Sequence, residues 1–429
     1  MQLIASPSGP LSGDVAIPPD KSISHRALIL GGLADGETRI DGLLEAGDVL
    51  RTVAALQSFG ISVERRAPGQ WRVAGGNWRS PAAPIDCGNS GTAARLLIGA
   101  AAGFPLTATF TGDASLLRRP MDRLTRPLTA MGARFEGSET LPLTLHGGTL
   151  RGTCHHNLPS SAQVKSALLL AGLRAEGSVE IVEPLPTRDH TEILLRQFGA
   201  GVDSDGGVVR LAPNRRVVGT DVIIPADPSS AAFALAAAAI VPGSEVTVKD
   251  VLLNPLRSGF LMALQRMGAD LQLANIRGRC GETIGDVQVR HAPLFATDFA
   301  AEEIPSMIDE IPALAVIAAF ARGETRIEGL AELRYKESDR KAAMVRGLTA
   351  CGIDASVEGG ALIVGGRGGA RGGVAIDSRG DHRIAMAFAV VGLAAQAPVT
   401  VERAEMIATS FPNFVEVMGA IGAELDELE

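Results

Sequence analysis

Aromatic residues and cysteines are scarce in this chain. Aromatics make up 4% of the 429 residues, with two tryptophans and one tyrosine, whereas hydrophobic residues make up 46%. A core with so few rings must be built mainly from Ala, Leu, Val and Ile. No two of the four cysteines form a C-x-x-C pair, which argues against a zinc ribbon or a thiol–disulfide motif. We therefore expect the reduced thiols of a cytoplasmic protein.

Clustered positive charge and long apolar runs are missing as well. The formal net charge is −8 and no stretch gathers lysine and arginine, so neither nucleic acid nor a membrane is an expected partner. The longest apolar runs, 231–242 and 311–321, are shorter than the ~18–20 residues of a membrane helix. Residues 1–10 contain neither a basic segment nor an apolar run. No signal peptide is predicted, and the expected location is the cytoplasm.

The chain does contain an internal repeat. The segment GETRIDGL at 36–43 returns as GETRIEGL at 323–330, each time after an Ala- and Leu-rich stretch. A glycine that ends an amphipathic segment recurs six times, at intervals of about 70 residues. These glycines are Gly60, Gly132, Gly199, Gly268, Gly352 and Gly422. Each suits the left-handed position that follows the last turn of a helix.

Each unit has the same predicted order: an extended piece, an apolar helix, a β-branched strand, an amphipathic helix that ends at the glycine, and closing strands. The apolar helices are predicted at 26–33, 93–102, 164–173, 231–241, 312–322 and 383–393. One unit cannot bury its apolar face alone, so we expect an α/β (α+β) protein with two domains of three units each. A continuous solenoid is the alternative.

A short polar motif precedes each apolar helix. The motifs are PDKS at 19–22, GNSGT at 88–92, PSSAQ at 159–163, DPSS at 227–230, IDE at 308–310 and GDHR at 380–383. Capping alone would explain any one of them. Helix starts also attract anions, and several carry a cation within a turn. Those cations are Lys21, Arg26, Arg95, Lys165, His382 and Arg383. The segment KESDR at 336–340 contains both acidic and basic residues, which is consistent with either a solvated helix start or an acid–base centre.

Taken in order, these motifs resemble those of the 5-enolpyruvylshikimate-3-phosphate synthase family. Residues 19–26, PDKSISHR, resemble its P-D-K-S-x-S-x-R signature, and GNSGT with Arg95 resembles a second signature. RPM at 119–121, SAQ at 161–163, KESDR at 336–340 and DHR at 381–383 resemble further motifs of the family. The likeness runs from about Ser12 to Glu424, which is nearly the whole chain.

The resemblance implies the two-domain enolpyruvyltransferase fold, with three βαβαββ units arranged about a pseudo-threefold axis in each domain. It places one domain at 1–19 plus 226–429 and the other at 20–225. It implies a transferase of the shikimate pathway that moves the enolpyruvyl group of phosphoenolpyruvate onto the 5-hydroxyl of shikimate 3-phosphate and releases phosphate. The family expectation is a monomer that works through a tetrahedral intermediate without a metal or a cofactor.

The resemblance also implies residue roles. Asp309 would accept a proton, Glu337 would donate one, and Lys21 would offset developing negative charge. The implied shikimate 3-phosphate set is Lys21, Ser22, Arg26, Ser161, Ala162, Gln163, Arg188, Asp309 and Lys336. The implied phosphoenolpyruvate set is Lys21, Gly91, Arg119, Gln163, Arg340 and Arg383. Planar guanidinium groups suit a substrate that carries both a carboxylate and a phosphate.

The chain departs from the family pattern near its C-terminus. Ser410 stands where many members have a lysine before Phe-Pro, so the lysine contact with phosphoenolpyruvate is in doubt. The segment Asp189-His190-Thr191 and Ser410 resemble a second subgroup, some of whose members tolerate glyphosate. Tolerant members often have Ala at the position of Gly91. Because Gly91 leaves that space open, sensitivity to glyphosate is expected.

Three other functions compete with this interpretation. UDP-N-acetylglucosamine enolpyruvyltransferase shares the fold and the donor, but it begins with Lys-Asn and usually has a cysteine in the loop that corresponds to 112–121, which contains none here. A non-catalytic anion-binding relative would have lost Lys21, Asp309 or Glu337, and all three are present. RNA 3′-phosphate cyclase shares the repeat unit, but the acidic balance argues against nucleic acid.

Overall fold

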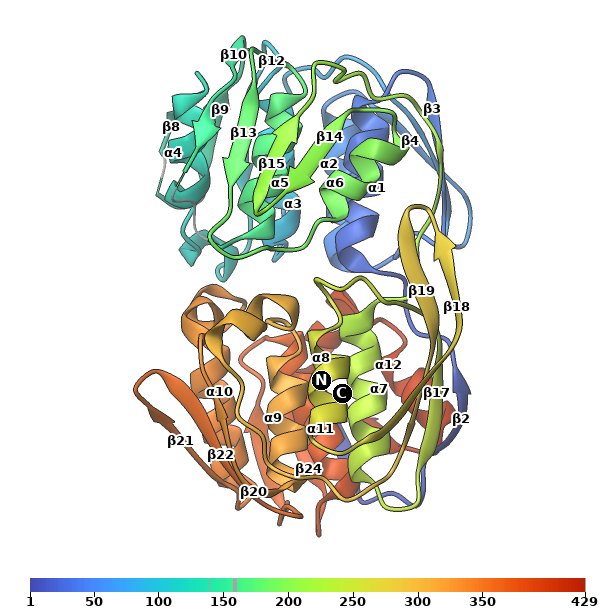
Figure 1. The fold of residues 1–429 in the computed structure, drawn as a ribbon. Coiled ribbons are helices and arrows are strands. Elements are labelled where there is room, and N and C mark those ends of the chain that lie inside the picture. Colours follow the sequence, from blue (N-terminus) through green and yellow to red (C-terminus); the bar gives the residue numbers. More distant parts are fainter. Residues whose placement is uncertain (138, 157–159, 429) are drawn as a thin grey trace. The chain divides into compact units, whose positions relative to one another are not determined.

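The computed structural model describes residues 1–137, 139–156 and 160–428 (Figure 1). The chain forms two compact units. Unit 1 consists of Met1–Pro18, Pro225–Gly278 and Glu282–Glu429, and unit 2 consists of Pro19–Ile224 with Arg279–Gly281. The main chain therefore leaves unit 1 after Pro18 and returns to it at Pro225. The sequence did not predict that the three residues 279–281 would group with unit 2.

Unit 2 is built on three buried helices: α1 (Lys21–Leu33), α3 (Gly91–Ala101) and α5 (Ala162–Gly172). Helix α3 packs against both α1 and α5. Gly99 of α3 lies so close to Ala167 of α5 that a Cβ atom at Gly99 would stand 2.4 Å from the Ala167 carbonyl oxygen. Small residues at this contact thus allow the two helix backbones to approach closely. Such close packing suits a core that is rich in alanine and poor in aromatic side chains.

Among the described residues of unit 2, three four-stranded sheets share the same pattern. Their strand orders are β16 (Asp221–Ile223), β3 (Glu37–Asp41), β5 (Gln70–Ala74), β4 (Ser62–Ala67); β6 (Ile85–Asp86), β7 (Thr107–Thr111), β9 (Leu143–His146), β8 (Arg134–Glu136); and β11 (Cys154–His155), β13 (Val179–Val182), β15 (Val208–Leu211), β14 (Val202–Asp205). In each sheet the first pair is parallel and the following pairs are antiparallel. The short strands β10 (Leu150–Arg151) and β12 (Ala175–Glu176) pair separately. Buried residues alternate with exposed ones along β3 and with half-buried ones along β13, so one face of each sheet packs inward.

Unit 1 repeats this plan around α7 (Pro228–Ile240), α9 (Ile311–Phe320) and α11 (His382–Ala394), which all contact one another (Figure 1). Every residue of α7 and α9 is buried. The sheets run β2 (Ser12–Val15), β17 (Glu245–Leu252), β19 (Glu282–Arg290), β18 (Asp270–Arg279); β20 (Arg322–Ile327), β22 (Ala361–Arg367), β21 (Asp354–Glu358); and β23 (Val374–Asp377), β24 (Val399–Glu402), β1 (Gln2–Ser6), β25 (Glu424–Leu428). The N-terminal strand β1 thus completes the sheet of the last repeat.

A second helix in each repeat ends two residues before a landmark glycine. These helices are α2 (Gly47–Ser58), α4 (Asp122–Ala130), α6 (His190–Gln197), α8 (Gly259–Arg266), α10 (Arg340–Ala350) and α12 (Phe414–Ala420). All six glycines have positive φ, from 81° at Gly352 to 111° at Gly132, as a left-handed helix terminus requires. In the described part of the chain, four 3₁₀ helices lie in the loops: η1 (Leu116–Arg118), η2 (Ala301–Ser306), η3 (Leu330–Tyr335) and η4 (Ala404–Thr409).

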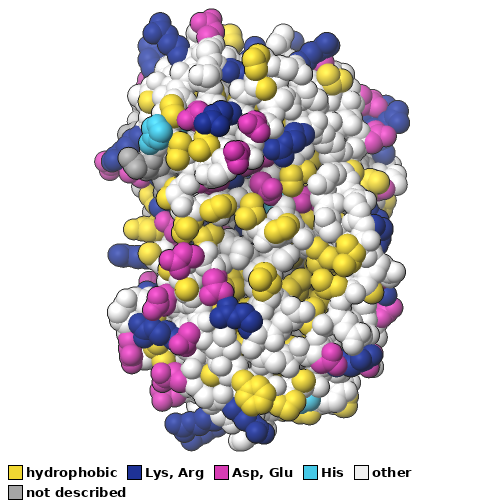
Figure 2. Space-filling model, in the orientation of Figure 1, with side chains coloured by type: hydrophobic (Ala, Val, Ile, Leu, Met, Phe, Trp, Pro, Cys, Tyr) yellow, Lys and Arg dark blue, Asp and Glu magenta, His cyan; other side chains and the backbone are white. Residues whose placement is uncertain are grey.

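The predicted fold is confirmed, and two closed units replace the solenoid alternative. The predicted apolar helices began too late. Helix α1 starts at Lys21 and not at residue 26, because the polar motif after Asp20 already forms the first turn. On the face drawn in Figure 2, side chains of both charge signs are interspersed. Within the described residues, none of the helices combines the length and the apolarity that crossing a membrane requires.

Candidate active site

The starts of α3 and α5 lie side by side at one end of unit 2. Gln163 links them, because its Oε1 accepts a hydrogen bond from Arg95 Nη1 at 2.7 Å and its Nε2 donates to Thr92 Oγ1 at 2.9 Å. Ser90 caps α3 by accepting from the amide of Ala93 at 3.1 Å. Ser161 stands at the N-cap of α5 without a side-chain cap bond among the described residues. Pro159 of the predicted motif 159–163 lies outside the described residues.

Gly91 is the first residue of α3, and two guanidinium groups crowd it. A Cβ atom there would lie 2.8 Å from Arg95 Nη1 and 3.1 Å from Arg119 Nη1. Arg119 is buried and donates from Nη2 to Asn89 Oδ1 and, at 3.2 Å, to Ser115 Oγ. Two arginines at the positive end of a helix make this a candidate site for an anion in a chain whose overall charge is negative. The structure thus brings together Gly91, Arg119 and Gln163 from the predicted phosphoenolpyruvate set.

Helix α1 contributes Lys21, Ser22 and Arg26 to the same unit. Asp20 caps this helix by accepting from the Ile23 amide at 2.7 Å. Lys21 Nζ lies 3.0 Å from Asp48 Oδ2 near the start of α2, and both side chains are mostly buried. Arg26 Nη1 donates to the Ser22 carbonyl oxygen at 2.9 Å. Asp48, 27 residues along the chain, was not predicted, although a lone lysine at a buried helix start signals the need for a partner.

The remaining predicted residues of unit 2 lie at the starts of α5 and α6. Ala162 is the first residue of α5, and Arg188 stands two residues before α6. Lys165, one of the cations within a turn of a helix start, is 3% exposed and ion-paired with Glu183 and Glu192, each at 2.8 Å. It faces the interior between α5 and α6, where the two glutamates balance its charge, so it is not among the cations available to a ligand.

In unit 1, Arg340 is the centre of a cluster of carboxylates. Its side chain is 1% exposed and donates from Nε to Asp381 Oδ2 at 2.9 Å, from Nη1 to Asp309 Oδ1 at 3.2 Å and from Nη2 to Glu337 Oε2. Burial acts to lower the pKa of Arg340, but the negative charges of Asp381, Glu337 and Asp309 outweigh it and raise that pKa. Arg340 therefore remains charged. Because its side chain is buried, the segment 336–340 is not simply a solvated helix start at this residue.

Asp309 is held from several directions. Its Oδ1 also accepts from Lys336 Nζ at 3.0 Å, and its carbonyl oxygen accepts from Arg383 Nη1 at 2.9 Å. Asp381 caps α11 through the Arg383 amide at 3.0 Å while its other oxygen holds Arg340. Unit 1 thus gathers Asp309, Lys336, Glu337, Arg340 and Arg383, which are all the residues predicted there. Two carboxyl groups among fixed cations suit proton transfer on an anionic substrate.

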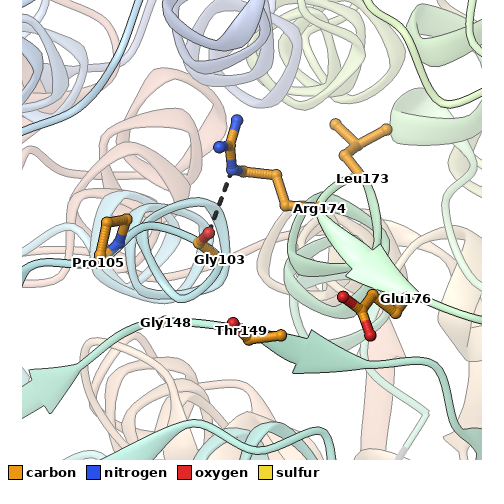
Figure 3. A pocket seen from close by; sticks show the side chains of 7 residues that line it. All are labelled: Gly103, Pro105, Gly148, Thr149, Leu173, Arg174 and Glu176. Carbon is orange, nitrogen blue, oxygen red and sulfur yellow. Dashed lines mark hydrogen bonds between the residues drawn. The ribbon is translucent and has the colours of Figure 1, made fainter.

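A pocket among the described residues lies away from these helix starts. Its volume is about 510 Å³, and it is lined by residues just beyond the C-terminal ends of α3 and α5, among them Gly103, Leu173 and Arg174 (Figure 3). Arg174 Nε donates to the Gly103 carbonyl oxygen at 3.1 Å. Helix C-termini carry partial negative charge, so this end of the helices is the less favourable one for an anionic substrate. No cluster of three or more potential metal ligands occurs among the described residues.

The imidazole of His25, on α1 with Lys21, is fully buried. Its Nδ1 is hydrogen-bonded to Thr52 Oγ1 at 2.7 Å, and Ser90 Oγ lies 3.5 Å from Nε2. Burial, assisted by the positive charges of Lys21 and Arg26 and opposed by Asp20, lowers the pKa of His25 to about 3. In the unfolded chain this imidazole binds a proton below about pH 6.5, whereas in the folded chain it stays neutral until the pH approaches its lowered pKa of about 3.

Acid should therefore destabilise the protein through His25. The contribution of neutral His25 is complete above about pH 6.5 and is lost by about 1.4 kcal/mol per pH unit as the pH falls below that value. We expect His25→Gln to remove this part of the pH dependence, so that its stability deficit shrinks by about 2 kcal/mol between pH 6.5 and 5. Urea unfolding of both proteins across that interval measures the difference. Parallel curves would contradict the assignment.

The fold places the chain among the enolpyruvyltransferases. The enolpyruvyl transferase NikO from Streptomyces tendae superposes with a TM-score of 0.79 over 99% of this chain and 98% of that one, at 18% identity, a likeness that shows the fold alone. EPSP synthase from Acinetobacter baumannii superposes with a TM-score of 0.87 at 40% identity, covering 99% of this chain and all of the other.

Sequence comparison then gives the family. The profile of EPSP synthase (3-phosphoshikimate 1-carboxyvinyltransferase) matches residues 5–418. The 3-phosphoshikimate 1-carboxyvinyltransferase of Phenylobacterium zucineum is 54% identical, covering 99% of this chain and 95% of its own length. That of Caulobacter vibrioides is 52% identical, covering 99% of both. The chain belongs to the EPSP synthase family, and it is a transferase.

Proposed function

We propose that this chain transfers the enolpyruvyl group of phosphoenolpyruvate to the 5-hydroxyl of shikimate 3-phosphate and releases inorganic phosphate. The observation that carries the proposal is the Arg340 cluster, in which Asp309 and Glu337 share one buried guanidinium in a chain that matches the family over nearly its full length. We also propose that units 1 and 2 correspond to the two domains expected at 1–19 plus 226–429 and at 20–225. The protein then serves aromatic amino-acid synthesis.

Asp309 and Glu337 divide the proton transfers in this proposal. Asp309 accepts the proton of the attacking hydroxyl, which is a poor nucleophile without a base. Glu337 gives a proton to the methylene carbon of phosphoenolpyruvate, so that the neighbouring carbon can be attacked. The tetrahedral intermediate then loses phosphate and the same methyl carbon returns a proton. Contacts from Lys336, Arg340 and the Arg383 side chain fix Asp309 in place for the first of these steps.

The proposed binding set of each substrate includes residues of both units. Gly91, Arg119, Gln163, Arg340 and Arg383 are proposed to bind phosphoenolpyruvate, whose carboxylate and phosphate both suit guanidinium groups. Shikimate 3-phosphate is proposed to contact Ser22, Arg26, Ser161, Ala162, Gln163, Arg188, Lys336 and Asp309. Lys21 is proposed to contact both substrates. Because these roles fall on both units, the reaction requires residues of each.

Phosphate release tests the proposal directly. Purified protein should release phosphate only when shikimate 3-phosphate and phosphoenolpyruvate are present together. Release with UDP-N-acetylglucosamine as the acceptor would support the alternative enolpyruvyltransferase, which the absence of cysteine from residues 112–121 disfavours. No release with either acceptor would indicate a non-catalytic anion-binding relative. We further propose a cytoplasmic monomer, which sedimentation of the purified protein checks for the oligomeric state.

Gly91→Ala should weaken phosphoenolpyruvate binding. The new methyl group would have to displace the Arg95 and Arg119 guanidinium groups, which stand 2.8 and 3.1 Å from the Cβ position. Loss of one well-placed charge-assisted hydrogen bond corresponds to an about tenfold rise in the KM for phosphoenolpyruvate. The KM for shikimate 3-phosphate should change much less. Glyphosate inhibition, measured at fixed phosphoenolpyruvate, should weaken in the same variant, and unchanged values for both ligands would contradict the crowding argument.

A further inference from the structure

Arg26 is oriented by two buried hydroxyl groups that come from different helices. Its Nε donates to Thr191 Oγ1 of α6 at 2.7 Å, and its Nη2 donates to Ser166 Oγ of α5 at 2.7 Å. Both hydroxyl-bearing residues are fully enclosed, and Arg26 itself is 3% exposed. Three helices, α1, α5 and α6, therefore meet at this one guanidinium group.

The two hydroxyls are arranged as acceptors toward the cation. Thr191 Oγ1 donates its own hydrogen to Ser166 Oγ at 2.7 Å, so that hydrogen points away from Arg26. Each oxygen then offers a lone pair to a guanidinium N–H. A hydrogen bond to a charged group in an enclosed site is stronger and more directional than one in water. The pair thus fixes the plane of the guanidinium and not merely its position.

A buried ion cluster adjoins this pair. Lys165, the residue before Ser166, lies 2.8 Å from Glu183 and 2.8 Å from Glu192, the residue after Thr191. Lys165 Nζ also donates to the Thr187 carbonyl oxygen at 3.1 Å. Because the ion pair joins α5 to α6 one residue away from each hydroxyl, it fixes the spacing at which the two hydroxyls meet Arg26.

We infer that Thr191 and Ser166 are positioning residues that act through Arg26 to set the affinity for shikimate 3-phosphate. The inference rests on the proposed function, in which Arg26 binds that substrate. The positioning residues need not touch the substrate. Their loss leaves the guanidinium charge and the hydrogen bond from Nη1 to the Ser22 carbonyl oxygen in place, but it removes the acceptors of Nε and Nη2. The guanidinium is then less firmly oriented, so the effect falls on binding of one substrate and spares the chemical step.

Thr191→Val is the primary test, since valine keeps the shape and the buried apolar surface and removes the hydroxyl. The expected result is an about tenfold rise in both the KM and the dissociation constant for shikimate 3-phosphate, the scale of one charge-assisted hydrogen bond. The turnover number and the KM for phosphoenolpyruvate should stay within about twofold. Thr191→Ser should restore the wild-type values, and Ser166→Ala should reproduce the defect.

Thr38→Val is the matched control. Thr38 is a buried threonine of the same unit, on β3, and its hydroxyl has no hydrogen-bond partner in the described structure. The substitution makes the same chemical change without touching Arg26. Kinetic constants of this variant should equal those of the wild type, whereas a general response of unit 2 to losing a buried hydroxyl would appear in both variants and would overturn the inference.

Arg26→Lys separates the inference from the proposed function. If the wild type releases no phosphate with the two substrates, both fail together. If the wild type is active but Arg26→Lys leaves the affinity for shikimate 3-phosphate unchanged, the role of Arg26 fails and the inference falls with it. If Arg26→Lys weakens that affinity but Thr191→Val and Ser166→Ala do not, only the positioning role is overturned.

Discussion

Glu337→Gln should bind both substrates and turn over about 10²–10⁴-fold more slowly, the range that a positioned general acid contributes. The amide keeps the size of the side chain and can still accept a hydrogen bond from Arg340 Nη2. It cannot supply a proton to the methylene carbon of phosphoenolpyruvate. The dissociation constant for shikimate 3-phosphate should stay within about threefold, since Arg340 keeps its contacts with Asp309 and Asp381.

Asp339→Asn is the control for the loss of charge. It removes one carboxylate from the same segment, and asparagine can still cap α10 by accepting from the Ala342 amide, as Asp339 does at 3.1 Å. Its turnover should be near that of the wild type. Deuterium incorporation from heavy water into the methylene group of phosphoenolpyruvate, in the presence of shikimate 3-phosphate, reports the proton transfer itself. Turnover of Glu337→Gln within about fivefold of wild type would remove Glu337 from the donor role.

The sequence predicted the repeat because its signals are local. A glycine that must adopt positive φ, such as Gly268 after α8, is visible in one short segment together with the apolar stripe of Phe260, Leu261, Leu264 and Met267. The helix starts were placed less well. The predicted helices began after their capping motifs, as if the motifs were loops. In the structure, the residues that follow Asp20 and Ser90 already belong to the first helical turn.

The partners of the site residues could not be predicted, because they come from other elements. Asp48 lies 27 residues from Lys21, and Asp381 lies 41 residues from Arg340. Nor could the sequence tell which side of α5 Lys165 would occupy. A cation near a helix start can point to a ligand or to the interior, and the choice depends on Glu183 and Glu192, 18 and 27 residues farther along the chain.

Lys165→Met should lower the free energy of unfolding by about 3–5 kcal/mol, the usual consequence of removing one partner from a buried ion cluster. Glu183 and Glu192 are 8% and 1% exposed, so the variant would bury two carboxyl groups without their cation. Burial raises the pKa of Glu192, and the charge of Lys165 opposes that rise. In the variant Glu192 should therefore hold a proton in the folded state at a pH where the unfolded chain has released it.

That linkage fixes the sign of the pH dependence. A glutamate carboxyl whose pKa is raised on folding contributes stability that is present below its unfolded pKa of about 4.3 and is lost as the pH rises through the folded pKa. The deficit of Lys165→Met should accordingly be larger at pH 8 than at pH 5. Urea unfolding at both pH values measures it.

Arg216→Met is the exposed counterpart of this change. Arg216 pairs with Asp35 at 2.7 Å, but the two side chains are 71% and 64% exposed, so its loss should cost less than about 1 kcal/mol. Adding Glu192→Met to Lys165→Met should recover much of the stability, because it replaces an uncompensated buried charge with apolar surface. A deficit no larger than that of Arg216→Met, or a double variant less stable than the single one, would show that the cluster does not hold α5 against α6.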